Sequence, residues 1–275
     1  MTQTIPYWHV DAFSSATFGG NQAAVMVLDE WLPDDVLQAI GAENLFAETA
    51  FIVKDARGEA DWELRWFTPT DEVALCGHAT LASGHVVLSD PARFGASDRV
   101  TFRTRKAGVL EVVRMDQGYE LALPVTLVEP SSQPELLAAI GFRGEAYLSW
   151  HGAEQTAIIL MESEDEIRAL KPDMEALRQI DLMAICTAPG ANHDIVSRVF
   201  VPAWGVDEDS VTGSAHAALA PFWAERLGRD TMTAHQASTR GGDLALRLEG
   251  SGKDARAWLG GPCVTVVEGV FYLTG

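Results

Sequence analysis

Residues 67–82 read FTPTDEVALCGHATLA, and residues 200–220 read FVPAWGVDEDSVTGSAHAALA. Both stretches begin with Phe-x-Pro, pass through acidic residues and end in a glycine followed by an alanine-rich run. Phe67 corresponds to Phe200 and Gly77 to Gly213, at offsets of 133 and 136 residues. Two such stretches in one chain indicate an internal repeat.

A third pair of segments keeps the same order at nearly the same spacing. TFRTRKAGVLEVV (101–113) and HQASTRGGDLALRL (235–248) both place a turn glycine before alternating apolar residues. Three matched anchors predict two duplicated domains. The segment PVTLVEPSSQPE (124–135) is rich in proline and serine, which marks it as the connection between the copies.

The alanine-rich runs predict one helix over residues 77–88 and another over residues 213–226. Both carry small or apolar side chains on every side, and a helix without a polar face is normally enclosed by other structure. RVTFRT, VLEVVRM and YELAL alternate apolar and polar residues, as antiparallel strands do. We therefore expect an α+β fold whose two pseudo-symmetric domains each curl a mostly antiparallel sheet around a central helix. An ordinary α/β layer with one buried helix fits the pattern equally well.

The composition limits the possible partners. The 275 residues include 39 acidic and 20 basic side chains, for a formal charge of −19, which repels polyanions. We therefore expect no nucleic acid and no membrane as partner. MTQTIPYWHVDAF shows no signal peptide, and three widely spaced cysteines argue against a disulfide framework. A cytoplasmic protein is expected.

The starts of the two helices are candidates for a binding site. Cys76-Gly77-His78 and Thr212-Gly213-Ser214 open them, where free backbone N–H groups favour a carboxylate or a developing enolate. If the domains face each other about a pseudo-twofold axis, both starts point into the cleft between them. The alternative is simple capping by Thr212.

Three residues are candidates for acid–base chemistry. Glu48 lies among apolar neighbours in AENLFAETAFIV, and a carboxylate that loses solvation suits proton transfer. Asp209 precedes the second helix, although Asp207 and Glu208 beside it are equally acidic. His78 lies in the first turn of the buried helix, where we expect burial and the helix N-terminus to keep the imidazole neutral.

Metal and thiol chemistry have less support in the sequence. The histidines show no HxH or HExxH spacing, so we predict no metal site. Cys76 is a candidate base, but a racemase that uses two thiols needs a second one opposite. The corresponding residue of the other repeat is Thr212, whose hydroxyl is no base near neutral pH.

At these residues the chain resembles the PhzF-like family, the phenazine-biosynthesis isomerases within the diaminopimelate epimerase fold. The resemblance runs nearly end to end. It is carried by VDAFSSATFGGNQAAVMVL (10–28), AENLFAETAFIV (42–53), CGHAT (76–80), the DSVTGSAH segment (209–216) and GGPCVTVVEGVFYL (260–273). CGHAT together with DxVTGSAH is a specific combination.

The resemblance implies two epimerase-like domains, residues 1–122 with 263–275 and residues 123–262, because the last strand returns to the first domain. It implies a homodimer without cofactor or metal. Glu48 would shuttle the proton, assisted by His78 and Asp209. Substrate would be bound by the positions that match Asn21, Gly77, Gly213 and Ser214.

Two departures from the family pattern concern proline. The chain has Gln22 where the family usually has proline after Asn21, and Ser210 where the family has proline after Asp209. Losing the second proline should free the backbone and fix the aim of Asp209 less rigidly.

The sequence thus predicts a cofactor-independent isomerase that moves a proton on carbon of a small, carboxylate-bearing metabolite, with Glu48 as acid and base between the domains. A thiol-dependent racemase or epimerase using Cys76 is one alternative. A non-catalytic small-molecule-binding protein of the same fold is the other.

Overall fold

The computed structural model describes residues 2–96, 98–152 and 154–274, and the chain divides into two compact units. The first unit comprises residues 1–122 together with 260–275, and the second comprises residues 123–259. The chain therefore leaves the first unit once and returns to it for its last strand.

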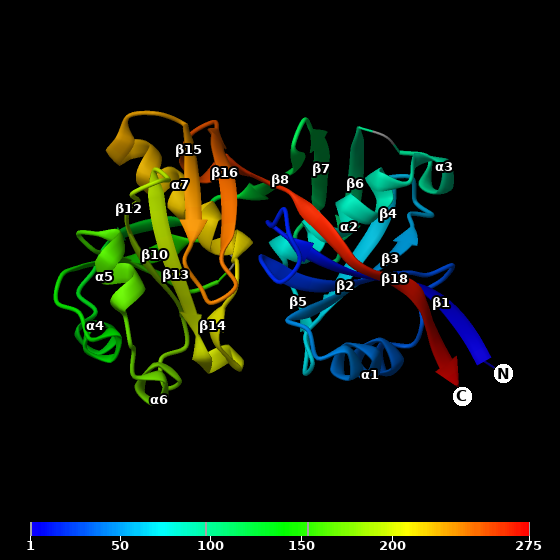
Figure 1. Ribbon diagram of the computed structural model, residues 1–275, viewed down its shortest axis with the longest axis horizontal. Helices are drawn as coiled ribbons and strands as arrows, with labels where there is room; N and C mark the ends of the chain where they lie inside the picture. The colour runs from blue at the N-terminus through cyan, green and yellow to red at the C-terminus, as the bar shows by residue number, and fades with distance from the viewer. Residues whose placement is uncertain (1, 97, 153, 275) are drawn as a thin grey trace. The chain divides into compact units, whose positions relative to one another are not determined.

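The first unit is built on one twisted sheet. The strands pair in the order β18–β1–β2–β3–β4–β6–β7–β8, with β5 beside β4, and β2–β3 and β4–β6 are the parallel pairs. β18 lies alongside β1, from Thr2 opposite Thr274 to Ala12 opposite Cys263 (Figure 1). The elements are β1 (Thr2–Ala12), β2 (Asn21–Val27), α1 (Asp34–Asn44), β3 (Glu48–Lys54), β4 (Trp62–Phe67), β5 (Glu72–Val73), α2 (Gly77–Ser89), α3 (Pro91–Phe94), β6 (Arg99–Thr104), β7 (Val109–Met115), β8 (Gly118–Pro124) and β18 (Cys263–Thr274).

The second unit repeats this pairing scheme. β11–β12 and β13–β15 are its parallel pairs, and β9–β10, β10–β11, β12–β13, β13–β14 and β15–β16 are antiparallel. The elements are β9 (Leu127–Pro130), α4 (Pro134–Ile140), β10 (Glu145–His151), β11 (Thr156–Leu160), α5 (Glu164–Ala169), α6 (Met174–Leu177), β12 (Met183–Pro189), β13 (Ile195–Val201), η1 (Pro202–Trp204), β14 (Val206–Asp209), α7 (Gly213–Leu227), β15 (Thr231–Gln236), β16 (Gly242–Glu249), η2 (Gly252–Asp254) and β17 (Arg256–Gly261).

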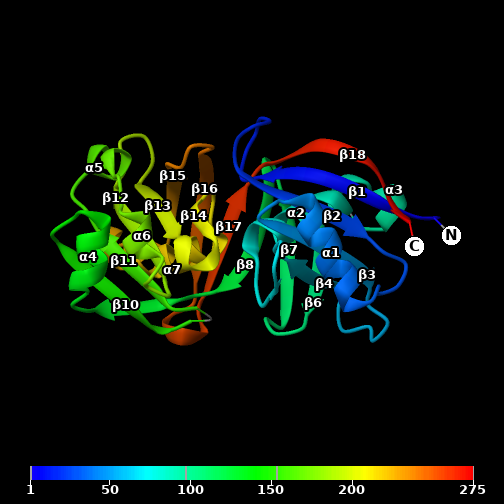
Figure 2. The same cartoon turned by 90° about the horizontal axis from the view of Figure 1, so that it is seen from below.

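Each unit encloses its own long helix, as the absence of a polar face predicts. α2 is buried from Gly77 through Gly84 and again from Val86 to Leu88, and it contacts β1, β2, β3, β6, β7 and β18. In both views α2 lies between β1 and β2 on one side and β6 and β7 on the other (Figure 1 and Figure 2). α7 is buried in the same way and contacts β9, β15 and β16.

These contacts confirm the predicted α+β fold, and the ordinary α/β layer is excluded. Among the helices that the structure describes, none combines the length and the apolar character needed to cross a membrane.

Gly84 lets α2 approach the sheet closely. A Cβ added at this position would lie 2.7 Å from the Val112 Cβ on β7, well inside van der Waals contact. Alanine normally stabilises a helix by about 1 kcal/mol relative to glycine. Here overpacking of the core, which costs about 1–3 kcal/mol, should outweigh that gain.

We therefore predict that Gly84→Ala lowers the midpoint of urea denaturation. Val112→Ala removes the two opposing methyl groups but keeps the Cβ, so it relieves part of the clash, and the double variant should be more stable than the two single changes predict together. A Gly84→Ala variant as stable as the wild type would contradict this account of the contact between α2 and β7.

Candidate functional site

The first group of candidate residues meets where three elements of the first unit begin. Asn21 is the first residue of β2 and Glu48 the first of β3, and these strands are parallel, with Ala23 opposite Glu48. Parallel strands begin at the same edge of a sheet, so both side chains belong to that edge. The start of α2 brings Cys76 and His78 to the same place.

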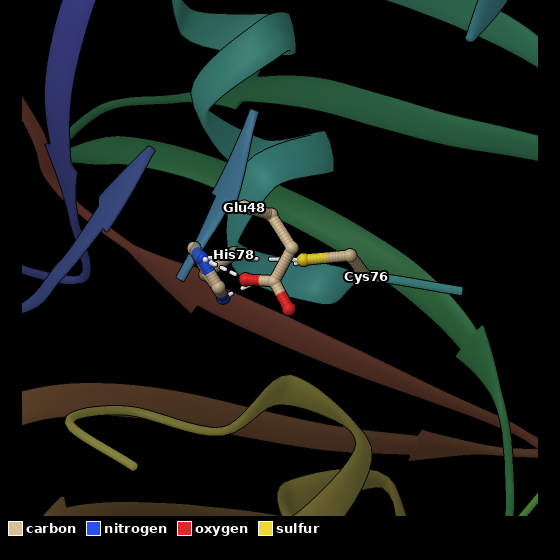
Figure 3. Close-up of side chains that lie close together, drawn as sticks. All are labelled: Glu48, Cys76 and His78. Carbon is tan, nitrogen blue, oxygen red and sulfur yellow. Dashed lines mark hydrogen bonds and ion pairs between the residues drawn. The ribbon is translucent and has the colours of Figure 1, made fainter. Parts of the chain in front are cut away.

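The side chains of Glu48, His78 and Cys76 point toward one another (Figure 3). The His78 Nε2 atom lies 3.1 Å from Glu48 Oε2. The Asn21 amide nitrogen lies 3.2 Å from Nδ1 of the same ring, and Cys76 Sγ lies 3.6 Å from Nδ1. The structure thus brings together the predicted residues Asn21, Glu48 and His78, and adds the thiol.

The Glu48 carboxylate is partly buried and partly exposed. Its Oε2 is buried and lies 3.1 Å from the His78 Nε2 atom. The side chain as a whole keeps 18% of its surface exposed. A carboxylate that is held by an imidazole and still keeps an exposed part suits proton transfer.

His78 differs from the expectation of a neutral imidazole. Burial lowers the pKa of the ring, but the contacts with Cys76 and with the Glu48 carboxylate 3.1 Å away outweigh burial and hold the pKa well above its usual 6.5. Burial and the helix N-terminus favour a neutral ring, but the carboxylate 3.1 Å away comes from a residue thirty positions earlier in the chain. A carboxylate at this distance favours the charged form of the imidazole.

Cys76 is poorly suited to act as a base. Burial, together with the nearby Glu48 charge, raises the pKa of its thiol to about 11. The thiolate is the reactive form of cysteine, and it is scarce near neutral pH at such a pKa. Because the thiol is then neutral, Glu48 is the anion that holds the His78 charge.

The second group lies in the other unit, around the start of α7. Thr212 extends the chain into the helix, but its hydroxyl does not cap the helix: it donates to Asp209 Oδ2 at 2.6 Å. The simple capping interpretation of Thr212 is therefore wrong. The Thr212 N–H instead donates to the side-chain oxygen of Gln236 at 2.8 Å.

Asp209 is held more firmly than the loss of proline predicted. The Ser210 N–H donates to Asp209 Oδ1 at 2.8 Å, a bond that proline cannot form. The Gln236 amide donates to the Asp209 carbonyl at 2.8 Å and to the Thr212 hydroxyl at 3.1 Å. Serine thus replaces the constraint of the proline ring with a hydrogen bond.

Gln236 is a residue of this group that the sequence analysis missed. It is fully buried on β15 and links Asp209 to Thr212. In the sequence Gln236 is marked only by its place before a turn, in HQASTRGG. The distant backbone groups with which a glutamine forms hydrogen bonds cannot be read from the sequence.

The structure also distinguishes the three neighbouring acids. Asp207 forms an ion pair with Arg178 at 2.7 Å, and Glu208 forms one with Arg198 at 2.7 Å. The Asp209 carboxylate accepts hydrogen bonds at the start of α7, from the Ser210 N–H and the Thr212 hydroxyl. Gly213 and Ser214 form the first turn of α7, and the Ser214 hydroxyl makes a long 3.9 Å contact with Met183 Sδ.

Gln22, the other departure from proline, also has a partner. Its side-chain nitrogen lies 3.1 Å from His9 Nε2, and the His9 ring stacks on Phe46 with centroids 4.5 Å apart. Phe46 is two residues before Glu48. The replacement therefore ties β1 and β2 to the segment that leads into the Glu48 strand.

Two groups of side chains among the described residues could hold a metal ion: Glu48 with Cys76 and His78, and His193 with His235 and Asp243. Metal ligands have to be deprotonated. Because Cys76 keeps its proton and His78 is held in its charged form, the first group suits proton transfer better than metal binding.

Several known proteins are similar to this chain in sequence along nearly its whole length. The sequence profile of the family described as "Phenazine biosynthesis-like protein" matches residues 10–269. An "uncharacterized isomerase" of Pseudomonas aeruginosa is 45% identical over 267 residues, covering 96% of this chain and 97% of that one. The mouse phenazine biosynthesis-like domain-containing protein 2 is 36% identical, covering 96% and 98%.

Solved structures agree with the fold. The crystal structure of a PhzF family protein of Enterococcus faecalis is 39% identical, with a TM-score of 0.86, and covers 98% of this chain and 100% of its own. A hydroxyproline epimerase of Agrobacterium vitis is 13% identical, with a TM-score of 0.66, covering 99% and 93%. The second likeness concerns the fold alone.

The raised pKa of His78 can be tested by its titration. We predict that the NMR titration midpoint of the His78 ring lies above 6.5, while His85 in the same helix, whose pKa burial lowers to about 4, stays neutral near pH 7. A His78 midpoint at or below 6.5 would remove the electrostatic account of the pair.

The same shift has a consequence for stability. Because the folded-state pKa of His78 is raised, the protonated ring stabilises the fold fully below pH 6.5, and this stabilisation is lost as pH rises through the folded-state pKa. From pH 6.5 up to the folded-state pKa, the free energy of unfolding of the wild type should therefore fall relative to that of His78→Gln. Parallel pH profiles of the two proteins would contradict this prediction.

Gln236→Met tests the support of Asp209. Methionine keeps the volume but leaves the Thr212 N–H and the Asp209 carbonyl without their side-chain partner, which should cost about 2–4 kcal/mol. Gln38→Met is the control, because half-buried Gln38 makes one recorded hydrogen bond, to the Thr68 carbonyl, and should cost about 1 kcal/mol. If both variants lose the same free energy of unfolding in urea denaturation, the two hydrogen bonds of Gln236 do not stabilise the protein more than the single bond of Gln38.

Proposed function

The chain belongs to the phenazine biosynthesis-like family, and on that premise we propose that it moves a proton on carbon of a small metabolite, with Glu48 as the acid–base group. The isomerase class follows from relatives that are named isomerases and that align with this chain over nearly their whole length. We further propose that the substrate bears a carboxylate, that Glu48 shuttles the proton and that no cofactor takes part.

The observation that carries the proposal is the placement of the Glu48 carboxylate. Its buried Oε2 lies 3.1 Å from the His78 ring, while the side chain keeps 18% of its surface exposed. An acid–base group has to be within reach of the proton it takes and must not already be saturated by protein donors. The exposed part of the Glu48 side chain leaves it accessible to a substrate.

The proposed reaction needs no oxidant or reductant. The Glu48 carboxylate takes a proton from a carbon next to a carbonyl or carboxylate, the C–H bond breaks, and its electron pair passes into an enolate. Glu48 then returns the proton to another carbon of the same molecule, and the electron pair forms the new C–H bond there. A single base implies that both transfers occur on one face of the substrate.

The neighbouring groups have assisting roles in this proposal. The His78 imidazolium stabilises the Glu48 carboxylate before proton transfer, and backbone N–H groups near Gly77 suit the developing enolate charge. Asn21 orients the His78 ring. Asp209, Gly213 and Ser214 of the second unit are proposed substrate-binding residues. Assembly as a homodimer stays a prediction.

The thiol-dependent racemase is the weaker candidate. A thiol whose pKa is about 11 supplies little thiolate at neutral pH, and its counterpart in the other repeat is Thr212. Treatment with iodoacetamide should therefore leave turnover largely intact. Rapid inactivation that substrate prevents would favour the thiol mechanism instead.

Exchange of carbon-bound protons tests the assignment of Glu48. The protein is incubated in D₂O with a pool of small carboxylic and aromatic metabolites, and mass spectrometry identifies the compound that gains deuterium. Acid–base catalysis typically supplies about 10²–10⁴-fold, so Glu48→Gln should slow the exchange at least that much. Glu43→Gln, the same change at an exposed position of α1, should have no effect.

Unchanged exchange in folded Glu48→Gln would refute the role of Glu48. Saturable binding of a pool compound without any deuterium gain in the wild type would favour a non-catalytic binding protein. Circular dichroism of both variants shows whether a lost activity reflects a lost fold.

A further inference from the structure

Three side chains of the second unit gather on its surface, and none of them belongs to the site proposed above. His193 precedes β13, His235 lies on β15 and Asp243 lies on β16. One donor atom from each lies within 4.8 Å of the others. We propose that they bind a divalent transition-metal ion of the zinc class.

The strand register explains why residues so distant in sequence meet. β15 and β16 are antiparallel with His235 directly opposite Asp243. β13 and β15 are parallel with Val196 opposite His235, so His193 reaches the same place from the turn before β13. Spacing along the chain could not reveal this cluster, and the prediction of no metal site rested on spacing alone.

The donor geometry suits a metal ion with few ligands. Asp243 Oδ1 lies 2.7 Å from His235 Nδ1 and 3.3 Å from His193 Nε2. The two imidazole rings stack with centroids 5.3 Å apart. Zinc binds nitrogen and carboxylate oxygen at about 2.0–2.2 Å in tetrahedral sites, which places neighbouring donors roughly 3.3 Å apart. The 2.7 Å contact between His235 and Asp243 is a hydrogen bond in the structure, and an ion bound between the two atoms would replace it.

The backbone that carries His193 is fixed in place. Asp194, the next residue, accepts hydrogen bonds from the Thr233 N–H and hydroxyl, and its own N–H donates to the Thr233 hydroxyl. Arg229 forms an ion pair with the same carboxylate. Thr233 is two residues before His235, so the turn and the strand that supply two of the donors are already joined.

The ligand set selects the kind of ion. Two imidazoles and one carboxylate suit zinc, nickel, copper or cobalt, whereas calcium and magnesium prefer oxygen ligands throughout. Asp243 is 66% exposed and the two histidines are partly exposed, which leaves room for water as a further ligand. The formal charge of −19 also attracts cations.

Zinc titration of the chelator-treated full-length chain tests the proposal. One equivalent of Zn²⁺ should bind to the wild type, with a chromogenic chelator as competitor. His235→Gln and Asp243→Asn should each weaken binding by about 10–100-fold or more. His151→Gln, a half-buried histidine of the same unit outside the cluster, should leave the affinity unchanged. An excess of Mg²⁺ or Ca²⁺ should not displace the zinc.

The Glu48 group has to be separated from this cluster. Zinc binding that is lost in Glu48→Gln and kept in His235→Gln would overturn the proposal, and so would a wild type that binds no zinc. X-ray absorption of the wild-type zinc complex adds a test that needs no variant. A first shell with two imidazoles supports the site, and a sulfur ligand contradicts it.

Discussion

The structure depends on the burial of two helices that have no polar face. α2 and α7 cannot lie on a surface, because small and apolar side chains surround them, and each sheet curls until its helix is enclosed. Enclosure also fixes where each helix begins. The α2 helix begins at the edge of the sheet where β2 and β3 start. Burial of the helix therefore places His78 next to Glu48.

Within that arrangement the charge balance decides which chemistry is available. Three ionisable groups lie together, yet burial keeps the Cys76 thiol protonated, with a pKa of about 11. The Glu48 carboxylate and the His78 imidazole are left as the pair that can exchange protons, and the carboxylate favours the charged form of the ring. In the second unit the Ser210 N–H and the Thr212 hydroxyl donate to the Asp209 carboxylate, and the Gln236 amide donates to the Asp209 carbonyl.

The repeat and the small-residue helices made the fold predictable, because both are local patterns in one sequence. Glu48 and His78 were predictable as site residues, but the protonation of His78 was not, since it depends on a partner thirty residues away. The same limit applies to Gln236 and to the cluster of His193, His235 and Asp243. Strand register, which the sequence does not display, brings those partners together.

Two adjacent residues of β15 take part in two different groups of side chains. His235 lies beside Asp243, and Gln236 holds the loop of Asp209. Successive residues of a strand face opposite sides, so shifting the register by one position would exchange the two. A single insertion or deletion between Thr231 and Gln236 would disrupt both groups at once. The length of this strand is therefore constrained as strictly as the identity of His235 and Gln236.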